Sequence, residues 1–398
     1  MKYTVASTRC DEYEVVKCRT AISKLIDDLG GIEKFVYPGD KILLKLNLLA
    51  GHKPELAATT HPVIVKAVVQ IVQAAGGIAY LGDSPGGMVT ESAYQQILET
   101  TGIAKAAQET GANIVFFDAG QQNYISKSAR KFKQFPVVQA AFDFDKVIAL
   151  PKLKTHQFTG LTCGVKLLYG YLPGITKAEN HLHAGKNIDT FSELLLDIYE
   201  SFPPMLTIAD AIVAMQGNGP AHGEPVSINL LFASTSAAAI DWAACRITGM
   251  PPDKIATVRL AGQREIGPKC NEDVEWLGMS PDEMHYKQFK PADAMSTTAF
   301  PAWFMSLSAY LFTPRPQITA KCKACGICFK HCPPHAMTMT PGKPPVIDYT
   351  KCIRCYCCQE LCPHDAVKVL PPRVKLSMDF AESVIKIARK LKGKDKVK

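Results

Sequence analysis

Apolar runs alternate with amphipathic stretches through the first two thirds of the chain. Residues 42–48 (ILLKLNL) have the continuous apolar character of a buried strand. Residues 61–75 have helical length, begin with Pro62 near the first turn and stop at a Gly-Gly pair. Residues 78–87 start as a strand and run into a glycine-rich turn. This order predicts a β-α-β unit.

The same alternation continues to about residue 250. Further helices are predicted at 92–112, 191–202 and 236–249, and further strands at 113–119, 146–154, 205–215 and 226–234. Such alternation predicts an α/β fold: a mostly parallel sheet with helices on both faces. Ligands of these sheets bind beyond the carboxyl ends of the strands, so the chemistry is expected in the loops that follow them.

Two cysteine runs follow this part of the chain, at residues 322–333 and 352–363. Each reads Cys-x2-Cys-x2-Cys-x3-Cys-Pro. Zinc sites favour two separated Cys pairs, whereas a run of four closed by proline is the bacterial ferredoxin pattern. The spacing predicts two [4Fe–4S] clusters in a small α+β dicluster ferredoxin domain.

The ligands of the two clusters are expected to cross between the runs, because in two-cluster ferredoxins the fourth cysteine of each run binds the other cluster. Cluster one is predicted to use Cys322, Cys325, Cys328 and Cys362, and cluster two Cys352, Cys355, Cys358 and Cys332. Tyr356 stands where the first run has Gly326, and Cys357, beside a ligand, is predicted not to be one.

These patterns divide the 398 residues into four parts. We expect an α/β domain at 1–264, an irregular linker rich in Pro and Met at 265–315, the ferredoxin-like domain at 316–372 and a basic amphipathic tail at 373–398. The tail is predicted to be a helix docked on the body or a patch for an acidic lipid or acidic partner protein.

Composition limits the class of protein. With 47% hydrophobic and 21% charged residues the chain is typical of a globular protein. No apolar run reaches the roughly 18–20 residues of a membrane span, and no signal peptide opens the chain. Because eight of the 14 cysteines have ligand spacing, a reducing cytoplasm is predicted. Residues 373–398 carry +6 of the net charge of +8, so no nucleic-acid partner is expected for the nearly neutral body.

Lysines and histidines gather in the loops that follow the predicted strands. The densest stretch, residues 152–183, holds seven of them between small Gly and Thr residues, which leave backbone N–H groups free to face an anion. Lysines would bind charge and a histidine would move a proton. The catalytic candidates are Lys154, His156, Lys166 and His181; the substrate- or cofactor-binding candidates are Lys45, Asn47, Asp83, Ser84, Lys152, Asp210 and Asp241. A Rossmann, Walker or GxSxG motif does not occur in these loops.

Three of these stretches resemble one known family. The motifs GDSPGG, LPKLKTHQFTGLTCGVKLLYGYLPG and DAIVAMQGNGPAHG are similar to those of the family called domain of unknown function 362, whose members often carry a C-terminal ferredoxin domain. The resemblance spans about residues 1–300 and implies a site that contains the candidates above, except Ser84. Leu167 departs from the asparagine usual in that family.

A weaker resemblance concerns the loop that contains Lys166 and His181. It is similar to the histidine–lysine loop of nickel-dependent lactate racemase, which implies that these two residues would hold a nickel-pincer nucleotide. His61 stands where that family has an arginine. The resemblance leaves an additional organic or nickel cofactor open.

Three functions remain open on the sequence. The first is an iron–sulfur oxidoreductase that passes single electrons to a small anionic or carbonyl-bearing substrate in the α/β domain. The second is an electron-transfer or docking subunit for a redox partner such as a ferredoxin, flavodoxin or reductase. The third is an isomerase or racemase-like enzyme with structural clusters.

Overall fold

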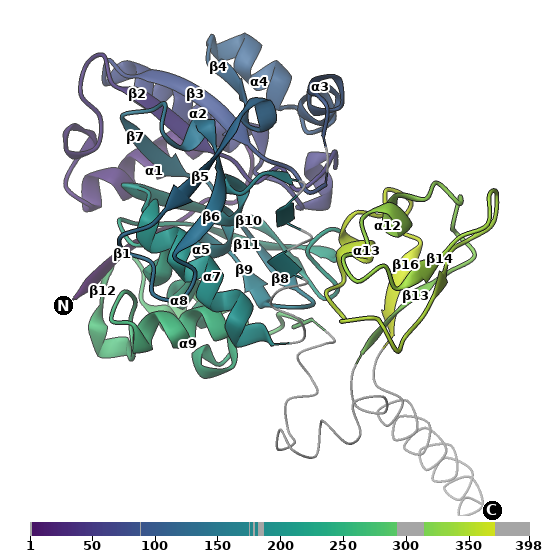
Figure 1. The fold of residues 1–398 in the computed structure, drawn as a ribbon. Coiled ribbons are helices and arrows are strands. Elements are labelled where there is room, and N and C mark those ends of the chain that lie inside the picture. Colours follow the sequence, from purple (N-terminus) through teal and green to yellow (C-terminus); the bar gives the residue numbers. More distant parts are fainter. Residues whose placement is uncertain are drawn as a thin grey trace, which may run out of the picture.

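The computed structural model describes residues 2–87, 89–174, 176–177, 180–181, 187–292 and 314–370. An α/β domain occupies the larger part, and a small cysteine-rich domain lies against one side of it (Figure 1). The predicted tail at 373–398 and His183, the last histidine of the lysine- and histidine-rich stretch 152–183, lie outside the described residues.

A sheet of ten strands forms the centre of the described α/β domain. Its strands are β1 (Tyr3–Arg9), β2 (Lys41–Lys45), β3 (Ile78–Asp83), β4 (Asn113–Phe116), β7 (Lys146–Ala149), β8 (Lys152–His156), β9 (Gly160–Thr162), β10 (Leu206–Gln216), β11 (Glu224–Ser234) and β12 (Val274–Leu277). The order is β12-β1-β11-β10-β7-β2-β3-β4, with β8 pairing β10 and β9. Pairing is parallel except where β11 and β9 meet their neighbours.

Helices cover both faces of this sheet. Alternate residues of β2 separate the two cores: Ile42 and Leu44 pack into one, Leu43 into the other. The first core includes α1 (Val15–Asp28), α2 (Pro62–Ala74), α3 (Glu91–Thr100) and α4 (Ile103–Thr110). The opposite face packs α5 (Gly164–Leu167), α7 (Ile188–Ser201), α8 (Ala237–Thr248) and α9 (Ala256–Gln263). The predicted fold class is therefore confirmed.

Several boundaries differ from the sequence prediction. The stretch 92–112 forms two helices because Gly102 turns the chain with φ of +75°. The stretch 146–154 forms β7 and β8, separated at Pro151, which has no N–H for a strand ladder. A hairpin of β5 (Gln121–Ile125) and β6 (Gln134–Val138) and short 3-10 helices connect these elements: η1 (Ile32–Lys34), η2 (Pro54–Leu56), η3 (Phe117–Ala119), η4 (Gln139–Ala141), η5 (Leu168–Tyr171), η6 (Pro252–Lys254) and η7 (Asn271–Asp273).

The predicted linker at 265–315 needs correction in its first half. β12 pairs in parallel with β1 at the edge of the main sheet, and α10 (Pro281–Met284) follows with Ser280 as its N-cap. Both elements have four residues, too few to produce a recognisable period in the sequence. The described residues up to 292 thus belong to the α/β domain.

The small domain repeats one structural unit around its two cysteine runs. Strands β13 (Arg315–Ile318) and β16 (Val367–Leu370) pair, as do β14 (Met337–Thr338) and β15 (Val346–Ile347). Each run contains a one-turn helix, α12 (Ile327–Lys330) or α13 (Cys357–Glu360). The residue before each helix is left-handed: Gly326 with φ of +76° and Tyr356 with φ of +62°. A tyrosine in this region is strained, and its hydroxyl donates a hydrogen bond of 3.0 Å to Pro314 O.

The second run makes hydrogen bonds to the α/β domain (Figure 1), and the first run approaches that domain at His331, which lies next to Gly87. Gln359 Nε2 donates to Asn218 O at 3.0 Å, and His222 Nε2 donates to Cys362 O at the same distance. Asn218 and His222 belong to the loop between β10 and β11. The second run is therefore fixed to a loop at the same end of the sheet as the predicted site.

Candidate functional site

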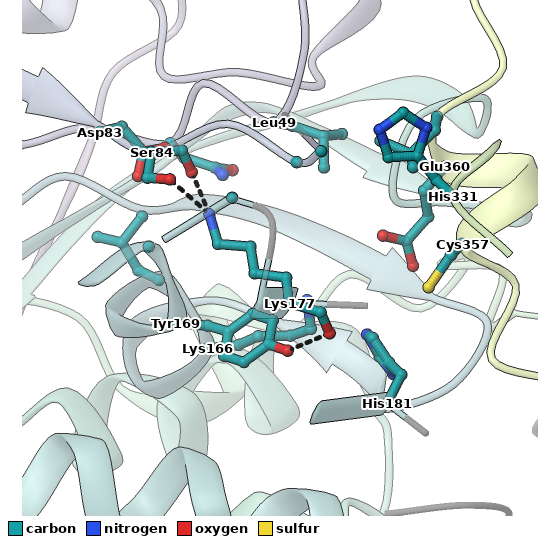
Figure 2. Close-up of a pocket in the computed structure, with 17 residues that line it drawn as sticks. Leu49, Asp83, Ser84, Lys166, Tyr169, Lys177, His181, His331, Cys357 and Glu360 are labelled. Atoms are coloured by element: carbon teal, nitrogen blue, oxygen red, sulfur yellow. Dashed lines mark hydrogen bonds between the residues drawn. The ribbon is translucent and has the colours of Figure 1, made fainter. Parts of the chain in front are cut away.

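One pocket is lined by both domains (Figure 2). The α/β domain contributes Asn47, Leu49, Asp83, Ser84, Gly86, Gly87, Lys166, Leu167, Tyr169, Gly170, Gly174, Lys177 and His181; the small domain contributes His331, Cys357, Glu360 and Leu361. The chain runs from β2 through β3 to β4 at one edge and returns to place β7 on the other side of β2. The pocket thus lies beyond the carboxyl ends of strands near this reversal, where open α/β sheets bind ligands.

Lys45 and Asp83 form a buried ion pair at the ends of β2 and β3. Lys45 Nζ also donates to Leu46 O at 3.2 Å, and Asp83 Oδ2 accepts from the Leu48 N–H at 2.7 Å. Burial lowers the pKa of Lys45, against the effect of the carboxylate. The backbone of Gly170 closes over the pair, since a Cβ there would clash with both charged groups. Lys45 is thereby shielded behind the pocket, and Asp83 lines it.

Lys177 has its donors occupied by the GDSPGG turn. Its Nζ hydrogen-bonds Ser84 O, Ser84 Oγ at 3.0 Å and Pro85 O at 3.1 Å. Ser84 Oγ in turn donates to Asp118 Oδ2 at 3.0 Å. Burial lowers the pKa of Lys177 to about 8. An ammonium has three donors, so Lys177 holds the turn and has none left for a ligand.

Lys166 lies on α5, and Asp241 fixes this helix. The Asp241 carboxylate accepts from the Gly164 N–H at 2.6 Å and from the Val165 N–H at 3.2 Å, and burial raises its pKa to about 7. Asp241 therefore positions α5 and does not line the pocket. Burial lowers the pKa of Lys166, opposed by Glu360. Among the described residues, Lys166 Nζ has no hydrogen-bond or ion-pair partner, so its donors are available to a ligand.

His181 lines the same pocket as a neutral imidazole. Its ring stacks on Phe191, with centroids 4.4 Å apart and planes at 19°. Burial lowers its pKa to about 3. In the part of the chain that the structure describes, His181 Nδ1 is buried without a hydrogen-bond partner. An unpaired buried polar atom is costly, and a polar ligand in the pocket would satisfy it.

His156 meets the small domain through Glu360. His156 Nδ1 accepts from the Phe158 N–H at 3.0 Å and the Thr159 N–H at 3.3 Å, which places the ring proton on Nε2. That atom lies 3.0 Å from Glu360 Oε1, but the two are not aligned for a good hydrogen bond. Burial lowers the pKa of His156 to about 4. For Glu360 burial raises the pKa, but His156 and Lys166 outweigh it and bring it to about 2.

Three other candidates lie outside the pocket lining. Lys152 Nζ bonds Asp210 Oδ2 at 2.5 Å and Tyr13 OH at 2.8 Å, and Tyr13 donates to the other oxygen of Asp210 at 2.8 Å. Lys154 Nζ donates to Ala58 O at 2.6 Å, and burial lowers its pKa to about 7. Lys152 and Asp210 thus neutralise each other, a pairing that the sequence does not predict.

Comparison with known proteins assigns the larger domain to a family. The family described as "Domain of unknown function (DUF362)" matches residues 42–246, just over half of the chain. The chain belongs to this family. A "4Fe-4S binding domain" matches residues 345–368, which contain the second cysteine run. The DUF362 domain therefore carries an iron–sulfur binding unit at its C-terminal side.

One relative is similar over most of its length. The thylakoid-associated protein sll1697 of Synechocystis sp. is 38% identical over 267 residues, which are 67% of this chain and 80% of the relative. The description thylakoid-associated applies to the Synechocystis protein. In the described part of this DUF362 protein, each helix is too short or too polar to cross a membrane.

Two solved structures are similar to part of this chain. The lactate racemase apoprotein of Thermoanaerobacterium thermosaccharolyticum has a TM-score of 0.41 and 11% identity over 63% of this chain and 58% of its own. A Thermotoga maritima protein has a TM-score of 0.30 and 14% identity over 52% of each chain. The matched part is thus under two thirds of either structure.

The eight predicted ligand cysteines fall into two groups that cross between the runs. Those predicted for cluster one line a single cavity: Cys322, Cys325, Cys328 and Cys362. In the other group, burial and the nearby thiols of Cys355 and Cys352 raise the pKa of Cys332. Within the described residues, no three His, Cys, Asp or Glu side chains are arranged around a single metal ion. Each group fits the four thiolates that a cubane requires.

Cys357 and Glu360 are two of the pocket residues that the sequence prediction missed; His331 is another. The first two occupy positions equivalent to Ile327 and Lys330 of the first run. Glycines of the GDSPGG turn also act differently from the prediction: a Cβ on Gly86 or Gly87 would lie 3.0 Å from Leu361 or 3.1 Å from His331. Because these glycines have no Cβ, the small domain as well as a ligand can come close to this turn. Comparing the two runs position by position could have revealed Cys357 and Glu360.

Proposed function

We propose that this DUF362 protein is an iron–sulfur oxidoreductase. It would carry two [4Fe–4S] clusters and reduce or oxidise a small carbonyl-bearing or singly anionic molecule in the pocket between its domains. One observation carries the proposal: Cys357 and Glu360, from the second cysteine run, line the same pocket as Lys166 and His181. When bound, the clusters would supply single electrons.

The charges of the pocket favour this class of ligand. Its lining contains two lysines, Lys166 and Lys177, and two carboxylates, Asp83 and Glu360. A polyanion such as a nucleotide phosphate would meet no excess of positive charge. One carboxylate or polarised carbonyl oxygen matches the single lysine, Lys166, whose donors are unassigned among the described residues.

Among the described residues, Lys166 Nζ and His181 Nδ1 have no hydrogen-bond partner, so both are available to a substrate. Reduction of a carbonyl to an alcohol takes two electrons and two protons. Lys166 would bind the carbonyl oxygen and donate a proton to it, because burial already weakens its hold on that proton. His181 Nδ1 would orient the ligand by a hydrogen bond. A reduced one-electron carrier protein would supply the electrons and water the second proton.

The supporting residues keep these two in place. Asp241 anchors α5 beneath Lys166, and Lys177 holds the Ser84 turn. Leu361 and Gly86 bring the domains into contact and limit access of water. Predicted residues away from the lining, such as Lys152 and Asp210, would stabilise the sheet end.

Analysis of the anaerobically purified protein tests the cofactor content. We expect about eight iron and eight sulfide per chain. A stoichiometric flavin, nickel or nucleotide in the same preparation would add a reaction centre to the pocket. About four iron would contradict the two clusters.

Reoxidation of the reduced protein tests the pocket. The protein is reduced with dithionite, freed of it, and mixed with short 2-oxo acids while the visible absorbance of the clusters is followed. Lys166→Ala should slow reoxidation at least about 100-fold, the usual minimum for a general acid. Lys127→Ala, an exposed position on the β5–β6 side, is the control. An unchanged rate in Lys166→Ala would remove Lys166 from the mechanism.

A carrier without a substrate is the second candidate. The exposed first run favours it, because an electron carrier needs an accessible cluster. In that case no 2-oxo acid or other small molecule would reoxidise the clusters, and a protein acceptor would. The predicted cytoplasmic location stays a prediction.

A further inference from the structure

Around Cys325 and Phe329 the first cysteine run is open to solvent, whereas the equivalent part of the second run is covered; His331, at the other end of the first run, lines the pocket. Cys325 is exposed, whereas the equivalent Cys355 is 8% exposed. Phe329 is 39% exposed, and the equivalent Gln359 is 2% exposed. The two runs have the same spacing, so contact with the α/β domain makes the difference.

The small domain also carries an excess of positive charge. Residues 314–370 contain eight Lys or Arg and three Asp or Glu, a net charge of +5. One of those acids, Glu360, faces the pocket. Lys323 lines the same cavity as Cys322 and Cys325. Among the described residues, Lys323 and Lys330 have no ion-pair partner, so both charges are free to attract a partner.

We propose that the first run is the docking face for an acidic one-electron carrier protein. This inference rests on the proposed function and gives it a direction: electrons arrive beside Cys325 and leave through the second run to the pocket. In each encounter the reduced carrier would give up one electron beside Cys325, where the first run would hold a cluster able to accept it, and the oxidised carrier would dissociate. Two encounters supply the two electrons of a carbonyl reduction.

The second run cannot serve as this face in the docked structure. Gln359 is bonded to Asn218 O, and Cys362 O is bonded to His222. Apolar Phe329 beside basic Lys330 gives the first run the mixed surface typical of transient interfaces. Charge complementarity selects an acidic partner and speeds its association.

The experiment uses an acidic [2Fe–2S] ferredoxin as probe and the full-length, anaerobic protein. Stopped-flow mixing gives the second-order rate of electron transfer from the reduced ferredoxin, and calorimetric titration gives the affinity of the oxidised one. We expect the double variant Lys323→Glu/Lys330→Glu to lower the rate about tenfold at low salt and to weaken binding. Added salt should reduce the difference in electron-transfer rate between the double variant and the unchanged protein. The extent to which dithionite reduces the protein should stay unchanged.

The control reverses the same number of charges elsewhere. Lys105→Glu/Lys127→Glu changes two exposed lysines of the α/β domain and should leave rate and affinity within twofold. An equal loss in this control would overturn the proposal, because net charge alone would then explain it. A loss seen only on deleting residues 373–398, or preference for phosphatidylserine vesicles over ferredoxin, would also overturn it. Lys166→Ala should not alter ferredoxin binding, which separates this outcome from failure of the pocket assignment.

Discussion

The two cysteine runs have the same spacing but different surroundings. In the first, Ile327 and Lys330 follow a left-handed Gly326, and the run is exposed at Cys325, Phe329 and Lys330. In the second, Cys357 and Glu360 follow a left-handed Tyr356 and enter the pocket of the DUF362 domain. The spacing meets the needs of a cluster, whereas the residues between the cysteines decide what the cluster would face. One repeat is adapted to solvent and the other to a site.

Loss of a ligand from either run should have the largest effect. We expect Cys325→Ala and Cys355→Ala each to remove about four of about eight iron atoms per chain. Iron and sulfide analysis of the anaerobic proteins measures this. Cys355→Ala should also lower the thermal midpoint more, because Cys355 is buried beside the domain contact. Full iron content in Cys325→Ala would show that the first run does not bind a cluster.

Substitution of Glu360 and of Lys330, which occupy equivalent positions, tests the difference in surroundings between the two runs. Glu360→Gln removes the carboxylate from the buried group of His156 and Lys166. Its loss should lower the free energy of unfolding by roughly 1–3 kcal/mol. Lys330→Gln, at an exposed position, should stay within about 0.5 kcal/mol. Urea denaturation followed by fluorescence measures both, and equal values would mean that Glu360 contributes nothing to docking.

Gly87 and Gly39 give the smallest and most local comparison. Both have similar backbones, with φ of +85° and +88°, so alanine costs each about 1–2 kcal/mol of strain. A Cβ at Gly87 also lies 3.1 Å from His331 Nε2, but one at Gly39 meets nothing within 4 Å. Only Gly87→Ala should speed hydrogen exchange in α12, whose C-cap is His331, because it loosens the contact between the domains. The same exchange in both variants would show that this contact does not hold the small domain.

Much of the fold could be predicted because its signals are local. Apolar runs and helical periods identified the mostly parallel sheet, and failed where elements are short, as in β12 and α10. The rule that ligands bind at the carboxyl ends of strands led to Asn47, Asp83, Ser84, Lys166 and His181, which line the pocket. Cysteine spacing likewise needs only a short stretch of chain.

Tertiary structure alone decided which of these charges are free. Lys45, Lys152 and Lys177 look alike in sequence, but buried partners occupy each of them. Lys166 has no such partner for its donors among the described residues. Asp241 fixes α5, which carries Lys166, and the docked second run holds Glu360 near it. A buried charge needs a partner, and that partner comes from wherever the fold brings it. The sequence therefore determined the types of residue at the site, and the packing of two domains determined their roles.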